Sequence, residues 1–237
     1  TGQWDWCKNV DLEKTCRLGL SGLTVRTKDS LSSIQLKMKN EKYNDPIKYY
    51  FNSIRILHSS NPINIKVNGT KVLTHDGSSF VNLNNITDSI SIDIKISNKG
   101  EYFELYGLIL ENEESKINYH TIGVNGAIAQ SYLKCEYFSK HLKNIDPDLI
   151  ILSLGTNEAF TEDFNLIEHE YVLKDLVLQI KDVTPYTDIL LTIPNDHFKN
   201  GKSNVNVERV RENILKIAKE FDLFYWDFYS IMGSQAS

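Results

Sequence analysis

The sequence predicts a protein of the α/β class, with two halves that differ in the spacing of their apolar residues. Residues 18–113 largely alternate apolar and polar side chains, which predicts an antiparallel β-sandwich of the jelly-roll type. Residues 114–237 alternate short apolar runs with stretches of helical spacing, which predicts a parallel sheet flanked by helices. Residues 1–17 lack a clear period, and we expect them to belong to the same domain as residues 114–237.

The strand pattern of the first half is strongest in two segments. Residues 89–97 alternate isoleucine with polar residues, and residues 63–74 form two alternating arms around Asn68-Gly69. Asn-Gly favours a two-residue type I′ turn, because both positions of that turn need a positive φ. Further strands are expected at residues 33–38, 49–57 and 102–110, for roughly eight strands in all.

The second half predicts alternating strands and helices. Residues 148–154 are largely aliphatic and lie between Pro147 and Gly155, which predicts a strand buried on both faces of the sheet. The other strands are expected at residues 117–123, 187–194 and 223–227. Helices are expected at residues 127–143, 165–182 and 204–221.

Composition excludes some classes of partner and site. The net charge of −5 provides no basic footprint for nucleic acid, and no apolar run approaches the length of a membrane span. No cysteine spacing is typical of a zinc site. His169 stands between two glutamates, which is too few ligands for a metal, and we expect it on a solvated helix face.

The three cysteines carry limited information. Cys7 and Cys16 lie close together in the chain, so they form a disulfide if the protein is exported, or remain two separate thiols. Cys135 falls within an expected helix and is interpreted as a small core residue.

Two glycine-bearing turns follow successive strands of the predicted parallel sheet. The first ends at Gly126, and the second reads Gly155-Thr-Asn-Glu158. The carboxyl ends of parallel strands meet at one edge, where open α/β sheets bind their ligands. The backbone N–H of Gly126 and the side-chain amide of Asn157 would together form an oxyanion hole. The alternative is that Asn157 only caps the helix that follows it.

These two turns resemble the second and third sequence blocks of the SGNH hydrolases, also called GDSL-like esterases. Residues 122–127 are similar to the second block, with Gly126 at the oxyanion position, and residues 155–158 are similar to the third, with Asn157 as the other donor. Glu158 stands where the family usually has aspartate. The resemblance implies catalytic roles for Gly126 and Asn157. The residues that we expect to contact substrate are Asn125, Thr156, Glu158 and, after the 187–194 strand, His197.

The resemblance also implies a fold, a reaction and a location. The α/β domain would be flavodoxin-like, and residues 18–113 would be a carbohydrate-binding-like domain inserted into it. Family members of this kind resemble O-acetylesterases that remove acetyl groups from peptidoglycan or polysaccharide by Ser-His-Asp chemistry. We therefore expect a secreted or periplasmic hydrolase whose partner is a carbohydrate ester, with no metal or organic cofactor.

The chain departs from the family at the nucleophile and the base. It contains no Gly-Asp-Ser, and none of its six histidines has an aspartate three residues earlier. Ser30 follows an aspartate, but the residues after it have a strand pattern where the family has a helix. We expect the serine block to precede Thr1 and the Asp-x-x-His block to follow Ser237. The alternatives are a glycan-binding protein that has lost catalysis and an O-acyltransferase.

Overall fold

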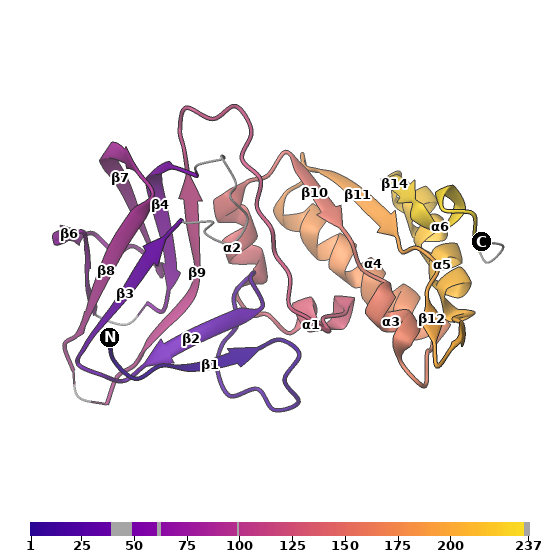
Figure 1. Ribbon diagram of the computed structural model, residues 1–237, viewed down its shortest axis with the longest axis horizontal. Coiled ribbons are helices and arrows are strands. Elements are labelled where there is room, and N and C mark those ends of the chain that lie inside the picture. The colour runs from indigo at the N-terminus through magenta and orange to yellow at the C-terminus, as the bar shows by residue number, and fades with distance from the viewer. Residues whose placement is uncertain (39–48, 61–62, 99, 235–237) are drawn as a thin grey trace. The chain divides into compact units, whose positions relative to one another are not determined.

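The computed structural model describes residues 1–38, 49–60, 63–98 and 100–234 of the 237-residue chain (Figure 1). The chain divides into two compact units, Thr1–Gly123 (the first unit) and Val124–Ser237 (the second unit). The first unit contains antiparallel sheets, and the second contains helices around a parallel sheet. The predicted mixed α/β class is therefore confirmed.

The first unit is built from two antiparallel sheets. The five-stranded sheet has the order β1 (Asp5–Lys8), β2 (Leu23–Thr27), β9 (Phe103–Glu111), β4 (Phe51–His58), β7 (Ser78–Thr87). The four-stranded sheet has the order β3 (Leu31–Lys37), β8 (Ser89–Ile96), β5 (Ile63–Val67), β6 (Thr70–Val72).

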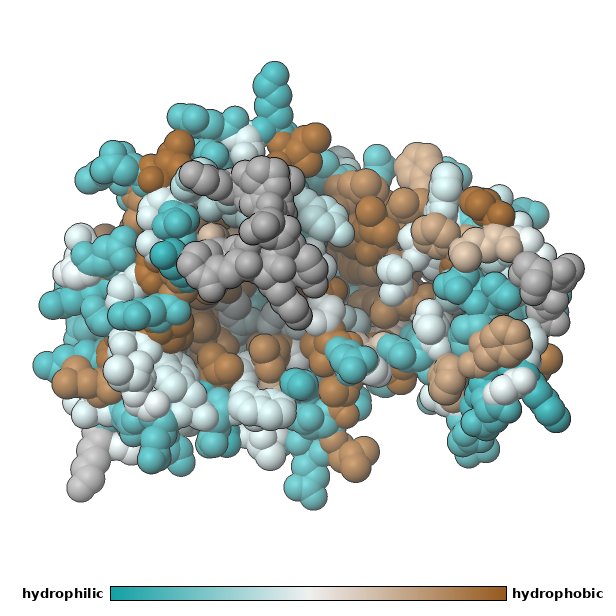
Figure 2. Space-filling view, viewed as in Figure 1, coloured by the Kyte–Doolittle hydropathy of each residue, from teal (hydrophilic) through white to brown (hydrophobic). Residues whose placement is uncertain are grey.

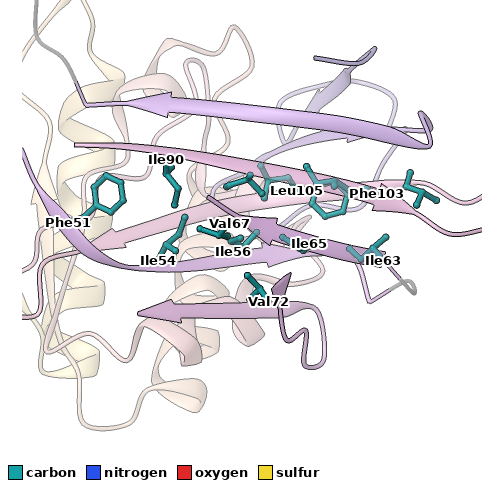
Figure 3. Close-up of a cluster of buried hydrophobic side chains, with 13 residues drawn as sticks. Phe51, Ile54, Ile56, Ile63, Ile65, Val67, Val72, Ile90, Phe103 and Leu105 are labelled. Atoms are coloured by element: carbon teal, nitrogen blue, oxygen red, sulfur yellow. The ribbon is translucent and has the colours of Figure 1, made fainter. Parts of the chain in front are cut away.

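The two sheets share one apolar core (Figure 3). The alternating isoleucines of β8 all point into it, and the buried faces of β4 and β9 contribute Ile54, Ile56 and Phe103. Each fully buried isoleucine stabilises the fold by roughly 1.5–3 kcal/mol relative to an exposed one. The alternation visible in the sequence therefore corresponds to the core face of this sheet.

Asn68 and Gly69 form the predicted hairpin turn between β5 and β6. Their φ values are 48° and 81°, as a type I′ turn requires, and Val67 pairs with Thr70 across the turn. Asn68 also accepts a hydrogen bond from the Ser91 N–H through its side-chain oxygen. The turn is thus fixed both by its own backbone and by the neighbouring strand β8.

The N-terminal segment lies in the first unit, whereas the sequence suggested that residues 1–17 belong with residues 114–237. β1 pairs with β2 antiparallel, with Trp6 opposite Val25. Cys7 and Cys16 form a disulfide that holds the intervening loop to this strand. The strand pairing of β1 spans only four residues, which is too short for its alternation to be recognised in the sequence.

The second unit contains a three-stranded parallel sheet in the order β10 (Leu149–Leu152), β11 (Asp188–Ile193), β14 (Phe224–Asp227). Its helices are α1 (Ala129–Leu133), α2 (Phe138–Ile145), α3 (Thr156–Phe160), α4 (Leu166–Val183), α5 (Asn206–Phe221) and α6 (Phe228–Ile231). A short hairpin, β12 (Phe198–Lys199) and β13 (Lys202–Ser203), follows β11.

Two expected elements of the second half differ in the structure. Residues 117–123 form no strand, and Ile117 and Tyr119 are largely exposed. The expected helix at 127–143 is broken into α1 and α2, because the Cys135 N–H bonds to the Tyr132 carbonyl, only three residues back, and starts a tight turn. Cys135 itself is buried, as expected.

The sheet of the second unit is covered unevenly. α5 packs against β11 and β14, on the face where Ile189 and Leu191 are buried. On the other face Leu149, Ile151, Phe224 and Trp226 are about half exposed or more, at 50, 49, 63 and 51%. Figure 2 shows hydrophobic surface over β10 and β11. The prediction that residues 148–154 are buried on both faces is therefore wrong, because β10 is an edge strand with one open face.

His169 also differs from its expected place. It lies on α4, but its side chain is only 7% exposed, and its Nδ1 is 3.1 Å from the Asn213 amide nitrogen of α5. The solvated face of α4 is formed instead by Glu170 and Lys174, which pair with Lys216 and Glu220 of α5. The imidazole of His169 and the carboxylate of Glu170 are adjacent in the sequence. The rotation of α4 about its axis therefore decides which of the two side chains faces the core.

Candidate functional site

The candidate site begins where the chain leaves β10 and turns into α3. Gly155 has a φ of +116°, and a Cβ at this position would lie 2.7 Å from Val210 Cγ1 and 3.3 Å from Pro194 Cδ. Only glycine accommodates both the backbone conformation and this close approach. The tight turn places Thr156 and Asn157 at the carboxyl edge of the sheet, where both are exposed.

Asn157 joins this turn to the turn before α1. Its Nδ2 donates a hydrogen bond to the Ala127 carbonyl oxygen over 2.8 Å, although the two residues are 30 positions apart. An amide nitrogen carries two hydrogens, so this bond leaves a second one available to a ligand. Because Ala127 directly follows Gly126, the structure brings together the two positions that the sequence selected.

Gly126 presents an open backbone surface beside this amide. It has a φ of +84°, and no atom lies within 4 Å of a Cβ built there. The turn that contains it is closed by the Ala127 N–H, which bonds to the Val124 carbonyl. The neighbouring Asn125 and Gly126 itself are both exposed. No neighbouring side chain therefore fills the space beside the Cα of Gly126.

Glu158 does not face this open surface. Its side chain is buried, with Oε1 accepting from the Ala129 N–H (2.9 Å) and Oε2 from the Gly155 N–H (2.8 Å). The sequence analysis placed Glu158 among the residues that contact substrate. The structure corrects this, because both carboxylate oxygens are used inside the protein.

His197 lies at the same edge of the sheet, after β11, and packs against α3. Its ring stacks on Phe160 at a centroid distance of 5.4 Å, and the Asn204 amide donates to its Nε2 over 3.0 Å. Phe160 follows Asn157 by three residues, so the two share one face of α3. Sequence reasoning selected His197 but missed Phe160, although that spacing from Asn157 was visible.

The described residues offer no obvious nucleophile at this site. Ser30 directly precedes strand β3, so it does not lie at a strand-to-helix turn. A hydrogen bond of 2.9 Å does join Ser79 to His58, but the two residues are 1% and 2% exposed. That pair lies inside the first unit, where an ester substrate cannot reach it.

The described residues contain neither a metal-binding cluster nor a membrane-spanning helix. No group of three or more histidine, cysteine, aspartate and glutamate side chains is placed there to hold a metal ion. In the same part of the chain, no helix has both the length and the apolar character needed to cross a membrane.

No protein-family model and no curated protein sequence matches the chain. Its fold is similar to the solved structure of a peptidoglycan O-acetylesterase, with a TM-score of 0.77 and 21% identity over 99% of this chain. The match covers 65% of that structure's length. The chain therefore shares the fold of this peptidoglycan O-acetylesterase over that part of its length.

Two other matches are weaker. A salicylyl-acyltransferase from a tetracycline biosynthetic pathway has a TM-score of 0.34 at 15% identity, over 89% of this chain and 71% of that one. A family two carbohydrate esterase from Clostridium thermocellum has a TM-score of 0.32 at 10% identity, over 96% and 89%. TM-scores this low do not establish a shared fold.

Proposed function

We propose that this chain is part of an ester hydrolase that removes O-acetyl groups from peptidoglycan or another carbohydrate polymer. The observation that carries the proposal is the hydrogen bond from Asn157 to Ala127, which holds an amide donor at the residue that directly follows the exposed Gly126. In the reaction, a serine oxygen attacks the ester carbonyl while a histidine accepts the serine proton. The carbonyl oxygen becomes an oxyanion, and Gly126 and Asn157 donate hydrogen bonds to it.

The serine and the Asp-x-x-His of this mechanism are proposed to come from polypeptide outside residues 1–237. Two observations support an additional element beside the sheet. β10 is an edge strand, and Leu149 and Ile151 are about half exposed on it. Sheets made only of parallel strands normally have both faces covered, because their strands are apolar on both sides.

The remaining site residues take secondary roles in this proposal. Asn125 and Thr156 flank the two oxyanion donors in the chain and would contact the substrate beside the ester. The Nε2 of His197 already accepts a hydrogen bond, so only its Nδ1 would be offered to a substrate hydroxyl.

The first unit is proposed to bind carbohydrate through a jelly-roll-like sandwich over residues 18–113, which precedes residues 114–237 of the hydrolase domain. Its two antiparallel sheets around one core support a sandwich of this kind. A periplasmic or secreted location is proposed with it. The Cys7–Cys16 disulfide supports that location, because disulfides persist in oxidising compartments.

The experiment compares the complete gene product with residues 1–237 alone. Both are assayed for acetate release from O-acetylated peptidoglycan, acetylated xylan and a small activated acetyl ester. We expect turnover by the complete protein and little or none by residues 1–237. The Ser30→Ala variant should leave the activity of the complete protein unchanged.

Other results would point to the alternative functions. Binding to these glycans without acetate release, by the complete protein, would indicate a glycan-binding protein and contradict the hydrolase. Transfer of the acetyl group to an added sugar in preference to water would indicate an acyltransferase. Robust turnover by residues 1–237 that disappears with Ser30→Ala would show that the nucleophile lies within this chain.

A further inference from the structure

We propose that Glu158 is a positioning residue of the oxyanion site: its buried carboxylate braces the turn at Gly155 against the turn at Ala129. By doing so it sets the distance between the Gly126 N–H and the Asn157 amide. This inference rests on the proposed function, because it concerns the same site. Glu158 touches no reacting atom in this scheme and acts only through its neighbours.

The geometry of the brace comes from three hydrogen bonds. The two oxygens of Glu158 accept from the Gly155 N–H (2.8 Å) and the Ala129 N–H (2.9 Å), and the next residue back, Asn157, donates to the Ala127 carbonyl (2.8 Å). Residues 155–158 are thus tied to residues 127–129 at two points. Hydrogen bonds to a carboxylate are roughly twice as strong as neutral ones, so Glu158 supplies the stiffer part of the connection.

One of these bonds is local to α3, and the other is long-range. A glutamate at the third position of a helix commonly accepts from the N–H at the helix start, and the bond from Gly155 to Oε2 is of this kind. The bond from Ala129 to Oε1 reaches a turn 29 residues earlier in the chain. Ala129 is the first residue of α1, so its N–H has no partner within that helix, and one carboxylate therefore caps both helices and ties their starts together.

Glu158 also lies near a side chain of α1. Tyr132 lies on α1, and burial is the main cause that raises its pKa. The charge of Glu158 raises the same pKa further, while a hydrogen bond with the Val124 backbone lowers it. The carboxylate therefore acts on the helix that follows the Gly126 turn as well as on its own helix.

Aspartate cannot perform the same task. It is one methylene shorter, about 1.5 Å, and so cannot reach the N–H groups of Gly155 and Ala129 together. The family block to which this turn is similar usually ends in aspartate, and this chain has the longer Glu158 at that position. Glu158→Asp keeps the charge and breaks the brace, and Glu158→Gln keeps the length but turns one acceptor into a donor.

The first test measures the position of Asn157 directly. In residues 1–237, the side-chain amide resonance of Asn157 is assigned by its loss in Asn157→Ala and is then followed in the Glu158 variants by NMR. We expect Glu158→Asp and Glu158→Gln to shift this resonance and to speed its hydrogen exchange by about 10-fold or more, through increased local opening. Glu212→Gln, an exposed glutamate of α5, is the matched control and should leave it unchanged. An unshifted Asn157 resonance in both Glu158 variants would overturn the brace.

The second test separates positioning from general stability in the complete, active protein. Glu158→Gln should lower kcat by about 10–100-fold with KM changed by less than about threefold, since a small displacement of a donor is costly in the transition state. In an Asn157→Ala background the same change should lower kcat by less than about threefold, because the donor that it positions is already absent. Equal losses in both backgrounds would contradict the inference.

The two tests also distinguish this inference from the proposed function. If the complete protein releases no acetate, the proposed function fails and the kinetic role of Glu158 fails with it. The NMR measurement still decides whether Glu158 holds Asn157 in place. If acetate is released but kcat is unaffected by Glu158→Asp and Glu158→Gln, the positioning role alone is wrong.

Discussion

Asn213 on α5 donates its side-chain amide to Nδ1 of His169 on α4 over 3.1 Å, and both side chains are buried. The same amide nitrogen also bonds to the Leu166 carbonyl. The ring nitrogen that faces Asn213 must therefore be an acceptor, so His169 is neutral with its hydrogen on Nε2. Burial lowers the pKa of His169 to about 4, against the opposing charge of Glu170, and burial lowers that of His141 to about 4 as well.

These two histidines predict acid destabilisation. Their folded-state pKa values lie below the unfolded value of about 6.5, so the unfolded chain binds more protons as the pH falls from 6.5 towards 4. Stability is fully present above pH 6.5 and is lost within this range, by up to about 3 kcal/mol for each ring. Denaturant unfolding of His169→Asn, followed by helical circular dichroism, should show a shallower loss between pH 6.5 and 4. A slope equal to that of the wild type would contradict this account.

Asn157→Ala should lower ester turnover by about 10²–10³-fold in the complete protein, which is the usual cost of one lost oxyanion donor. KM should change much less, because the donor acts mainly on the transition state. Asn195→Ala is the matched control, since Asn195 is exposed after β11 and donates to the neighbouring Asp196 carbonyl. Steady-state kinetics on an activated acetyl ester measure both variants, and equal losses in both would argue against a specific role for Asn157.

Gly155→Ala should destabilise the second unit by about 2–4 kcal/mol, from backbone strain and from overlap with Val210 and Pro194. Gly201→Ala separates the two causes. Gly201 also has a positive φ, at +74°, but no atom lies within 4 Å of a Cβ there. It should cost about 1–2 kcal/mol, from strain alone. Thermal unfolding of both variants tests the difference, and a Gly155→Ala protein as stable as Gly201→Ala would contradict the close packing.

Removing the Cys7–Cys16 disulfide should destabilise the first unit by about 2–3 kcal/mol, because the bond restricts a short loop in the unfolded chain. The variant is Cys7→Ser with Cys16→Ser, compared with the wild type in the presence and absence of reductant. Reductant should bring the wild type to the stability of the variant and leave the variant unchanged. A reductant effect of equal size on both proteins would assign the loss to another cause.

The sequence predicted those features that depend on neighbouring residues. The isoleucines of β8 and the Asn68-Gly69 turn were recognisable because period and turn chemistry are local. The glycine turns before α1 and α3 were recognisable for the same reason. Each of these predictions needed only a few consecutive residues.

Features that depend on distant partners could not be predicted. Residues 117–123 have a strand-like pattern, but a strand also needs a neighbour to pair with, and the sequence does not identify one. Glu158 was expected to face substrate, because its bond to Ala129 spans 29 residues and leaves no local trace. The inward rotation of His169 was missed because the helical pattern of α4 tolerates either face at that position.

The open face of the three-stranded sheet gives this chain an exposed apolar surface beside its polar ones. On this face Leu149 and Ile151 of β10 and Phe224 and Trp226 of β14 are each about half exposed or more. Such a surface binds detergent and hydrophobic dyes, and it favours self-association at high protein concentration. Polar substitutions at Phe224 or Trp226 would therefore improve solubility without removing a core residue, whereas the same change at Ile189 would unfold the unit.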